Sequence, residues 1–239
     1  MRSREYGQFC GLARAAEVLG QRWTLLILRD LLVGPRRFSD LVTGLPGIPT
    51  NLLSTRLREL EGDGLVTREL QAGQPRSVVY RATPRARQLA PALDELGRWG
   101  AATMRKPRDG EVVTDASLVA ALRAAANPGG IPSTIRKVVY VVRSGTAIAH
   151  VTVRNASITV EPGECPDPDL VLVAGPNFRD LLAGELEPDA AVDAGAVALH
   201  GDDKLLAEFV AVFRVPYADP ATNGDRAGPT TPGDHLAEG

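Results

Sequence analysis

Residues 47–65, GIPTNLLSTRLRELEGDGL, decide the fold of the first half of this chain. Leu53, Leu57 and Leu60 are four and three residues apart, a spacing that places their side chains on one face of a helix. The opposite side, at about 100° of rotation per residue, carries Asn51, Thr55 and Arg58, with Ser54 at its margin. The sequence therefore predicts an amphipathic helix with a polar stripe that its own core does not use.

The neighbouring segments predict short helices before this one and a hairpin after it. Helices are expected at residues 12–19, 23–32 and 37–42, and Gly and Pro then break the chain before Thr50, whose hydroxyl can cap the central helix. From Leu65 the apolar period changes to two, which predicts strands at 65–70 and 77–82. Thr83-Pro84 then opens a helix that we expect to run through about Met104.

The apolar stripe of this last helix is longer than the rest of its domain needs. Leu89, Leu93, Leu96 and Trp99 follow one side of it. The surplus favours an interface between two copies of the chain. The alternative, that the helix folds back on its own chain, stays open at this stage.

Length and composition indicate two ordinary domains. The chain has 239 residues, no apolar run of the roughly 18 residues that cross a bilayer, and no apolar leader at its N-terminus. We therefore expect a soluble, cytoplasmic protein that does not enter the membrane. Its two cysteines, Cys10 and Cys165, lie far apart, so a disulfide framework is not expected.

Charge is distributed very unequally between the two halves. Residues 1–108 contain 18 Lys and Arg against 10 Asp and Glu, whereas residues 109–239 contain 9 against 19. Arg supplies 17 of the first 18, and its planar guanidinium suits bidentate contacts to phosphate or guanine. The first half is therefore expected to meet a polyanion.

Three short helices, a helix after a Gly/Pro turn, a hairpin and a further helix are typical of a winged helix-turn-helix domain, in which the helix after the turn enters the major groove of double-stranded DNA. The candidate DNA-binding residues fall into three groups. Those on the polar stripe that can reach bases or phosphates are Thr50, Asn51, Ser54, Thr55 and Arg58. Those that flank the helix and suit phosphates are Arg36, Arg37 and Arg56. Arg76, at the hairpin tip, can lie along the backbone or enter the minor groove, and an ordinary solvated helix is the competing interpretation of the stripe.

Several blocks of the first half resemble the HxlR-type transcriptional regulators. They are AAEVLGQRWTLLILRDL at 15–31, GPRRFSDL at 34–41, Gly47-Ile48, LSTRLRELE at 53–61 and Gly64-Leu65-Val66. The resemblance covers about residues 8–104. It implies a homodimer joined through the helices near 12–19 and 84–104, with the two helices 50–61 reading half-sites related by a twofold axis.

Cys10 stands where members of this family often carry a cysteine that in some of them senses oxidants or electrophiles. Such a thiol must be accessible and have its pKa lowered by positive charge, for which Arg14, one helical turn further on, is the candidate. A small buried apolar residue is the alternative role of Cys10.

The second half is predicted to be a separate α+β domain. The boundary falls at residues 106–110, which divides the chain into a winged helix-turn-helix domain at 1–108, an α+β domain at 109–217 and a disordered tail at 218–239. Helices are expected at 116–126, 178–183 and 204–213, and strands at 136–143, 146–153, 156–160, 169–174 and 196–200.

The blocks PDLVLV at 168–173, FRDLLAGE at 178–185, AVALHGD at 196–202 and LLAEF at 205–209 resemble a sterol-carrier-protein-like domain. That resemblance implies a sheet covered by helices around an apolar tunnel for a hydrophobic small molecule. The residues named as its candidate lining are Val139, Val141, Ile148, Val151, Leu181, Leu182, Phe209 and Phe213, each of which can instead be plain core.

Catalytic chemistry is not expected. The three histidines have no metal-ligand spacing, and we find no nucleophile motif and no glycine-rich phosphate loop, so neither a metal nor a cofactor is predicted. The sequence favours a DNA-binding regulator that a hydrophobic ligand modulates. The alternative is a carrier or sequestering protein for hydrophobic ligands, whose winged half contacts other proteins.

Overall fold

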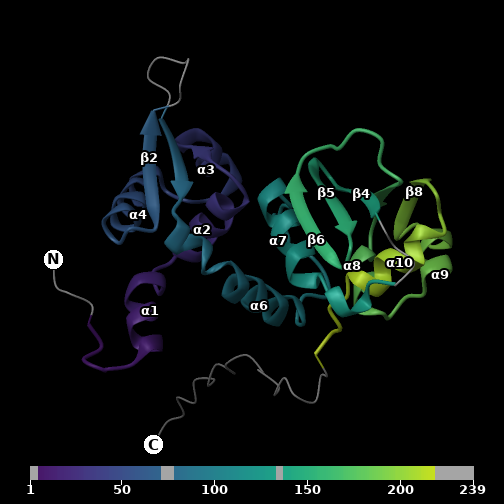
Figure 1. Cartoon of the computed structure of the whole chain (residues 1–239), viewed down its shortest axis with the longest axis horizontal. Coiled ribbons are helices and arrows are strands. Elements are labelled where there is room, and N and C mark those ends of the chain that lie inside the picture. Colours follow the sequence, from purple (N-terminus) through teal and green to yellow (C-terminus); the bar gives the residue numbers. More distant parts are fainter. Residues whose placement is uncertain (1–4, 71–77, 133–136, 219–239) are drawn as a thin grey trace, which may run out of the picture.

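The computed structural model describes residues 5–70, 78–132 and 137–218. Figure 1 shows two bodies joined by α6 and α7, with the first half of the chain in purple and blue and the second half in green and yellow. Within these ranges no helix has the length and apolar character that spanning a bilayer requires.

The first half has the predicted order of elements. Its helices are α1 (Gly11–Leu19), α2 (Thr24–Val33), α3 (Phe38–Gly44), α4 (Thr50–Gly62), α5 (Pro84–Arg87) and α6 (Ala90–Ala101). Its strands are β1 (Arg36–Arg37), β2 (Val66–Leu70) and β3 (Val78–Ala82), arranged in the order β1-β3-β2 with antiparallel pairing. Strand β1 was not predicted, because two residues show no periodicity.

The leucine face of α4 packs into the core of this half. Leu53, Leu57 and Leu60 are at most 2% exposed and lie with Ile27 and Leu28 of α2 in one apolar cluster. The turn before α4 needs a positive φ, which Gly47 supplies at +82°. Pro49, rather than Thr50, occupies the cap position, so the predicted hydroxyl cap of α4 is wrong.

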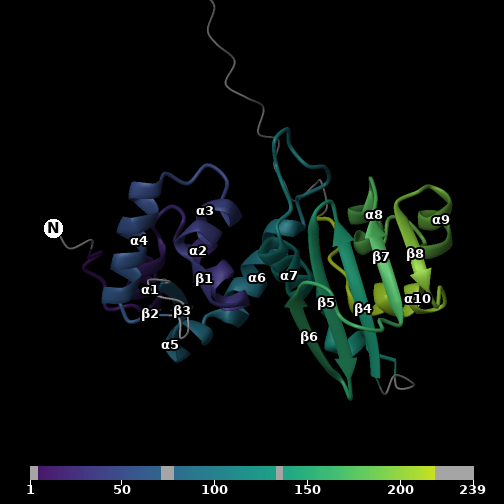
Figure 2. The same cartoon turned by 90° about the horizontal axis from the view of Figure 1, so that it is seen from above.

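The long helix predicted from Pro84 to Met104 is divided into α5 and α6. Thr83 caps α5 as expected, its hydroxyl oxygen accepting a hydrogen bond from the Ala86 N–H at 3.2 Å. Pro91 then stands in the first turn of α6, where its missing N–H breaks the hydrogen-bond ladder. The division lets α6 leave the winged body and run toward the second half (Figure 2).

The second half places helices around a five-stranded sheet, as the expected α+β class requires. The helices are α7 (Asp115–Ala125), the short 3-10 turn η1 (Pro128–Gly130), α8 (Phe178–Ala183), α9 (Pro188–Asp193) and α10 (Leu205–Val212). The strands are β4 (Lys137–Ser144), β5 (Ala147–Arg154), β6 (Ser157–Pro162), β7 (Leu170–Ala174) and β8 (Val197–Gly201), in the order β6-β5-β4-β7-β8. The pairing is antiparallel except between β4 and β7. Helix α9 was missed at the sequence level.

One face of this sheet carries the core. Tyr140 packs edge-on against Phe209 of α10, with ring centroids 5.2 Å apart, and Phe209 contacts Phe213 at 4.7 Å. Burial raises the pKa of the Tyr140 phenol well above its usual range. The apolar face of α7 joins the same cluster through Val119 and Leu122.

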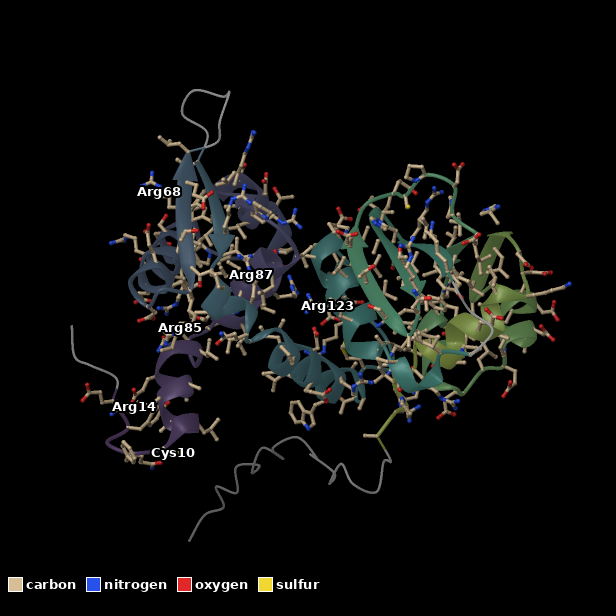
Figure 3. The ribbon with its side chains drawn as sticks, viewed as in Figure 1. Cys10, Arg14, Arg68, Arg85, Arg87 and Arg123 are labelled. Atoms are coloured by element: carbon tan, nitrogen blue, oxygen red, sulfur yellow. The ribbon has the colours of Figure 1, made fainter. Side chains whose placement is uncertain are left out.

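Polar contacts tie the two halves together along α6. Arg123 of α7 pairs with Asp94 of α6 at 3.0 Å, and Arg98 Nη2 donates to the Ala126 carbonyl at 2.9 Å. Figure 3 shows Arg123 at this junction. A Cβ added at Gly97 would lie only 3.3 Å from the Ala124 Cβ, so the two helices approach closely. One face of α6 therefore packs against its own chain, the alternative that the sequence left open.

Candidate nucleic-acid interface

Helix α4 presents a polar side to solvent because its leucine side is buried. Asn51 and Arg58 are exposed, and Ser54 and Thr55 are half-buried between the two sides. Thr50, in the first turn, is exposed as well. Five of the predicted residues are thus brought together on one helix surface, the arrangement that reading base edges in a groove requires.

The short side chains of α4 already use part of their hydrogen-bonding capacity. Ser54 Oγ donates to the Thr50 carbonyl at 2.9 Å, and Thr55 Oγ1 donates to the Asn51 carbonyl at 3.0 Å. Their oxygens keep lone pairs that can accept. Asn51 Oδ1 accepts from the Leu52 N–H at 2.9 Å, so pairing both amide atoms with an adenine requires this side chain to rotate.

Arg56 does not flank the helix as predicted. Only 9% of the residue is exposed, its Nη2 donates to Gln21 Oε1 at 3.0 Å, and its Nη1 forms an ion pair with Glu59. Burial follows from its position beside Leu53, Leu57 and Leu60 on the inner side of α4. The assignment of Arg56 to phosphate contact was wrong, because the guanidinium anchors α4 to the segment between α1 and α2.

Arg36 and Arg37 form β1 and lie beside the hairpin. Arg36 pairs in register with Tyr80 and Arg37 with Val79, and both side chains are half-buried. The Arg37 N–H donates to Asp40 Oδ2 at 2.9 Å, which fixes the start of α3. Arg76 lies outside the described residues.

Arg68 was not singled out by the sequence analysis. It is exposed on β2, opposite Tyr80, on the part of the hairpin that Figure 3 shows rising from the winged body. Its positive charge in a strand of the hairpin was the available signal, because the period of two places it on the same side of β2 as the buried Val66 and would have predicted burial. Arg81 on β3 is instead paired with Glu69 at 2.8 Å.

A buried carboxylate on α2 lies against the end of α3. Asp30 of α2 is 2% exposed and accepts from Arg29 Nε at 2.8 Å. Burial raises the pKa of Asp30, against the opposing charges of Arg29 and Arg36. A Cβ at Gly44, the last residue of α3, would lie 2.8 Å from Asp30 Oδ2. The small residue therefore lets α3 end directly against the carboxylate.

Cys10 is exposed at the start of α1 (Figure 3). The backbone N–H groups of Ala13 and Leu12 lower the pKa of its thiol. Arg14 does not have the predicted role, because its Nη1 bonds to Glu17 Oε2 at 3.2 Å and the backbone N–H groups, rather than its charge, lower the pKa of the thiol. The alternative of a buried apolar cysteine is contradicted by its exposure.

The predicted tunnel residues of the second half do not share one surface. Val151 pairs with Tyr140 and faces the core, together with Leu181, Phe209 and Phe213. Val139, Val141 and Ile148 stand on the other side of the sheet, because side chains alternate along each strand. Leu182 lines a cavity between the two halves instead. The eight residues therefore cannot enclose a single ligand, and the six that are buried, namely Val139, Val141, Val151, Leu181, Phe209 and Phe213, act as packing.

Side chains that could ligate a metal ion are not grouped in the part of the chain that the structure describes. Among residues 5–70, 78–132 and 137–218, no cluster of three or more His, Cys, Asp or Glu side chains is placed to hold a metal ion. His150 Nδ1 lies 3.0 Å from the Gly163 carbonyl, and its Nε2 lies 3.5 Å from Glu161.

Comparison with known proteins agrees with the geometry of the first half. Residues 18–108 match the HxlR-like helix-turn-helix family. The HTH-type transcriptional regulator sll1512 of Synechocystis sp. is 35% identical over 96 residues, which are 40% of this chain and 71% of that protein. YvaP of Bacillus subtilis is 38% identical over 86 residues, covering 36% of this chain and 80% of its own.

YodB of Bacillus subtilis, another HTH-type transcriptional regulator, is 34% identical over 85 residues, which are 36% of this chain and 76% of that protein. Its quinone-bound crystal structure aligns at 32% identity over 38% of this chain and 96% of that chain, with a TM-score of 0.34.

The fold and the exposed side of α4 define a DNA-binding transcriptional regulator of the winged helix-turn-helix class. The chain belongs to the HxlR-like helix-turn-helix family. Its relatives are transcriptional regulators and not enzymes, as the sequence predicted.

Proposed function

We propose that this regulator binds operator DNA as a homodimer and that its second half carries ligand control. The observation that carries the DNA part is the exposed polar side of α4, where Asn51 and Arg58 stand opposite three buried leucines. Arg58 contacts a base edge, whereas Arg37 of β1 and Arg68 of β2 contact phosphates of the DNA backbone and so fix the position of the protein on the duplex. Thr50, Ser54 and Thr55 supplement these contacts.

Exposed apolar side chains support the homodimer. Leu12 of α1 and Trp99 of α6 are each 79% exposed, and Phe9 just before α1 is fully exposed. Leu96, next to Trp99 on α6, is 52% exposed. Large apolar side chains gathered on two helices of one domain mark an interaction surface. A second copy that covers both helices would set the spacing of the two α4 helices on DNA.

The boundaries that we propose are a DNA-binding and dimerisation domain at 1–108 and a second domain at 109–217. The tail predicted at 218–239 lies, apart from Ala218, outside the described residues. The order of the sequence blocks in the acidic second half resembles a sterol-carrier-like domain, and the described residues of this half form a five-stranded sheet with helices. A hydrophobic ligand remains our proposal for its role. The alternative of a carrier with a protein-binding wing is less well supported, because the relatives named above are transcriptional regulators.

The DNA-binding proposal is tested by fluorescence anisotropy across a salt series. The affinity for DNA from around the protein's own coding region is compared with the affinity for a scrambled duplex. Arg58→Ala should reduce the preference for the native sequence by ~1–3 kcal/mol, whereas Arg37→Ala should weaken binding to every duplex and lower the salt slope by about 1. Equal losses on native and scrambled DNA from both variants would remove the base-reading role of Arg58.

The dimer is tested by analytical ultracentrifugation of Trp99→Glu and Leu12→Glu. A charge buried at a subunit interface should convert both variants to monomers and weaken operator binding. Val192→Glu, at a 40% exposed apolar residue of α9, is the matched control and should stay dimeric. Unchanged dimers in the two test variants would place the interface elsewhere.

A further inference from the structure

A cavity of about 490 Å³ lies where the two halves of the chain meet. Its walls come from α2, α6 and α7, with Leu182 of α8 and Val215 added from the second half. The lining is mostly apolar and includes Leu25, Leu32 and Leu93. This volume falls within the range of roughly 300–1,000 Å³ that is usual for small-molecule sites.

Small residues create the hollow. Helix α7 contributes Ala120, Ala121 and Ala124, and α6 contributes Gly97 and Gly100. Gly97 is in close contact with Ala124, but a Cβ added at Gly100 would meet no atom within 4 Å. Protein interiors are close-packed, so an apolar space of this size beside a helix crossing is unusual unless something fills it.

Three arginines, Arg29, Arg123 and Arg179, line the cavity. Arg29 pairs with Asp30, and Arg123 pairs with Asp94. Arg179 forms no ion pair with any residue that the structure describes. Its Nη2 donates to the Ala101 carbonyl at 2.9 Å, while its buried Nη1 has no acceptor among those residues. A desolvated donor without an acceptor is costly. Nη1 has almost no accessible surface, so a ligand acceptor can pair with it only after the guanidinium turns toward the cavity that Arg179 lines.

The surroundings of Arg179 keep that end positive. Its guanidinium lies 4.6 Å from the centre of the Tyr217 ring, and the Arg105 guanidinium lies 4.2 Å from the same ring. Tyr217 Oη donates to Asp180 Oδ1 at 2.6 Å. Two guanidinium groups thus lie against one ring whose hydroxyl bonds to a single carboxylate, and the excess of one positive charge favours an anionic ligand group over a neutral one.

We propose that this junction cavity is the effector site, and that it takes a small apolar molecule bearing one carboxylate or similar acceptor. The apolar body lies between α2, α6 and α7, and the acceptor pairs with the Arg179 guanidinium once this turns toward the cavity. The regulatory part rests on the proposed function. A ligand there contacts the helix that supports α4 and the helix that we assign to dimer contact, so its differential affinity can shift the spacing of the two DNA-reading helices.

The site is tested by isothermal titration of the full chain with decanoate and with 1-decanol. Gly100→Leu fills the hollow and should reduce the affinity for both probes by at least ~10-fold, whereas Ala92→Leu, which adds the same side chain on the exposed side of α6, should change neither. Arg179→Met should reduce the affinity for decanoate by ~10-fold and leave that for 1-decanol within ~2-fold. Thermal unfolding confirms that each variant is folded.

These outcomes distinguish a failure of the proposed cavity site from a failure of the proposed DNA-binding function. Equal decanoate binding by the Gly100→Leu and Ala92→Leu proteins would overturn the cavity, and equal loss of both probes in Arg179→Met would overturn the acceptor assignment. Absence of decanoate binding in a protein that still prefers its operator would overturn this inference alone. Decanoate binding without any DNA preference would overturn the proposed DNA function and leave the site standing. A Gly100→Leu protein that turns monomeric, while neither probe binds wild type, would assign the cavity to a second copy.

Discussion

Arg56 and Arg58 are two residues apart on α4, yet the structure predicts opposite consequences for their removal. Arg58 is exposed, whereas Arg56 is 9% exposed and bonds to Gln21 and Glu59. Arg56→Ala leaves the Gln21 amide oxygen and the partly buried Glu59 carboxylate without this partner. Leaving buried polar groups unsatisfied costs ~1–3 kcal/mol.

We therefore expect Arg56→Ala to lower the free energy of unfolding by ~1–3 kcal/mol, and Arg58→Ala to change it by less than ~0.5 kcal/mol. Urea unfolding followed by circular dichroism measures both, with an unchanged m-value indicating that stability alone has shifted. Under conditions where both variants are fully folded, Arg56→Ala should keep the salt slope of DNA binding, since its guanidinium contacts no phosphate. An unchanged urea midpoint together with a shallower salt slope would refute the buried placement of Arg56 and restore the phosphate role predicted from sequence.

Three further predictions concern other parts of the chain. Burial and the hydrogen bond to Asp180 raise the pKa of Tyr217 to about 12, so the folded state holds this proton more tightly than the unfolded state. The free energy of unfolding should therefore fall as the pH rises from about 10 through 12. A difference titration of phenolate absorbance between wild type and Tyr217→Phe measures this pKa, and a midpoint near 10 would contradict the prediction. Cys10 should react with iodoacetamide faster than Cys165, because its thiol is exposed and its pKa is lowered by backbone N–H groups. Arg14→Ala should leave this rate unchanged. A marked slowing in that variant would show that Arg14 does lower the pKa of the thiol. Gly201→Ala should destabilise the second half by about 1–3 kcal/mol, because φ is +124° and the added Cβ would lie 2.4 Å from the Asp169 carbonyl oxygen. Thermal unfolding measures this loss, and a melting temperature equal to that of wild type would rule out the strain.

Short-range sequence patterns were enough to predict the local structure and the class of the first half. Leucine spacing predicted α4, the change to period two predicted the hairpin, and Thr83-Pro84 predicted the start of α5, because each signal depends on neighbouring residues only. The same local patterns gave the strands and most of the helices of the second half. Asn51 and Arg58 could be assigned to the exposed side of α4 because its leucines already defined the buried side.

Which polar residues remain exposed and which apolar residues share a surface depends on contacts between distant segments, and the sequence did not predict it. Arg56 is buried because Gln21, distant in sequence, receives its guanidinium. Val141 and Val151 look alike in sequence, yet strand register places them on opposite faces of the sheet. The junction cavity joins α2, α6, α7 and α8, and no periodicity within one segment indicates that their small residues meet. These features arise from contacts between distant segments, which short-range patterns do not encode.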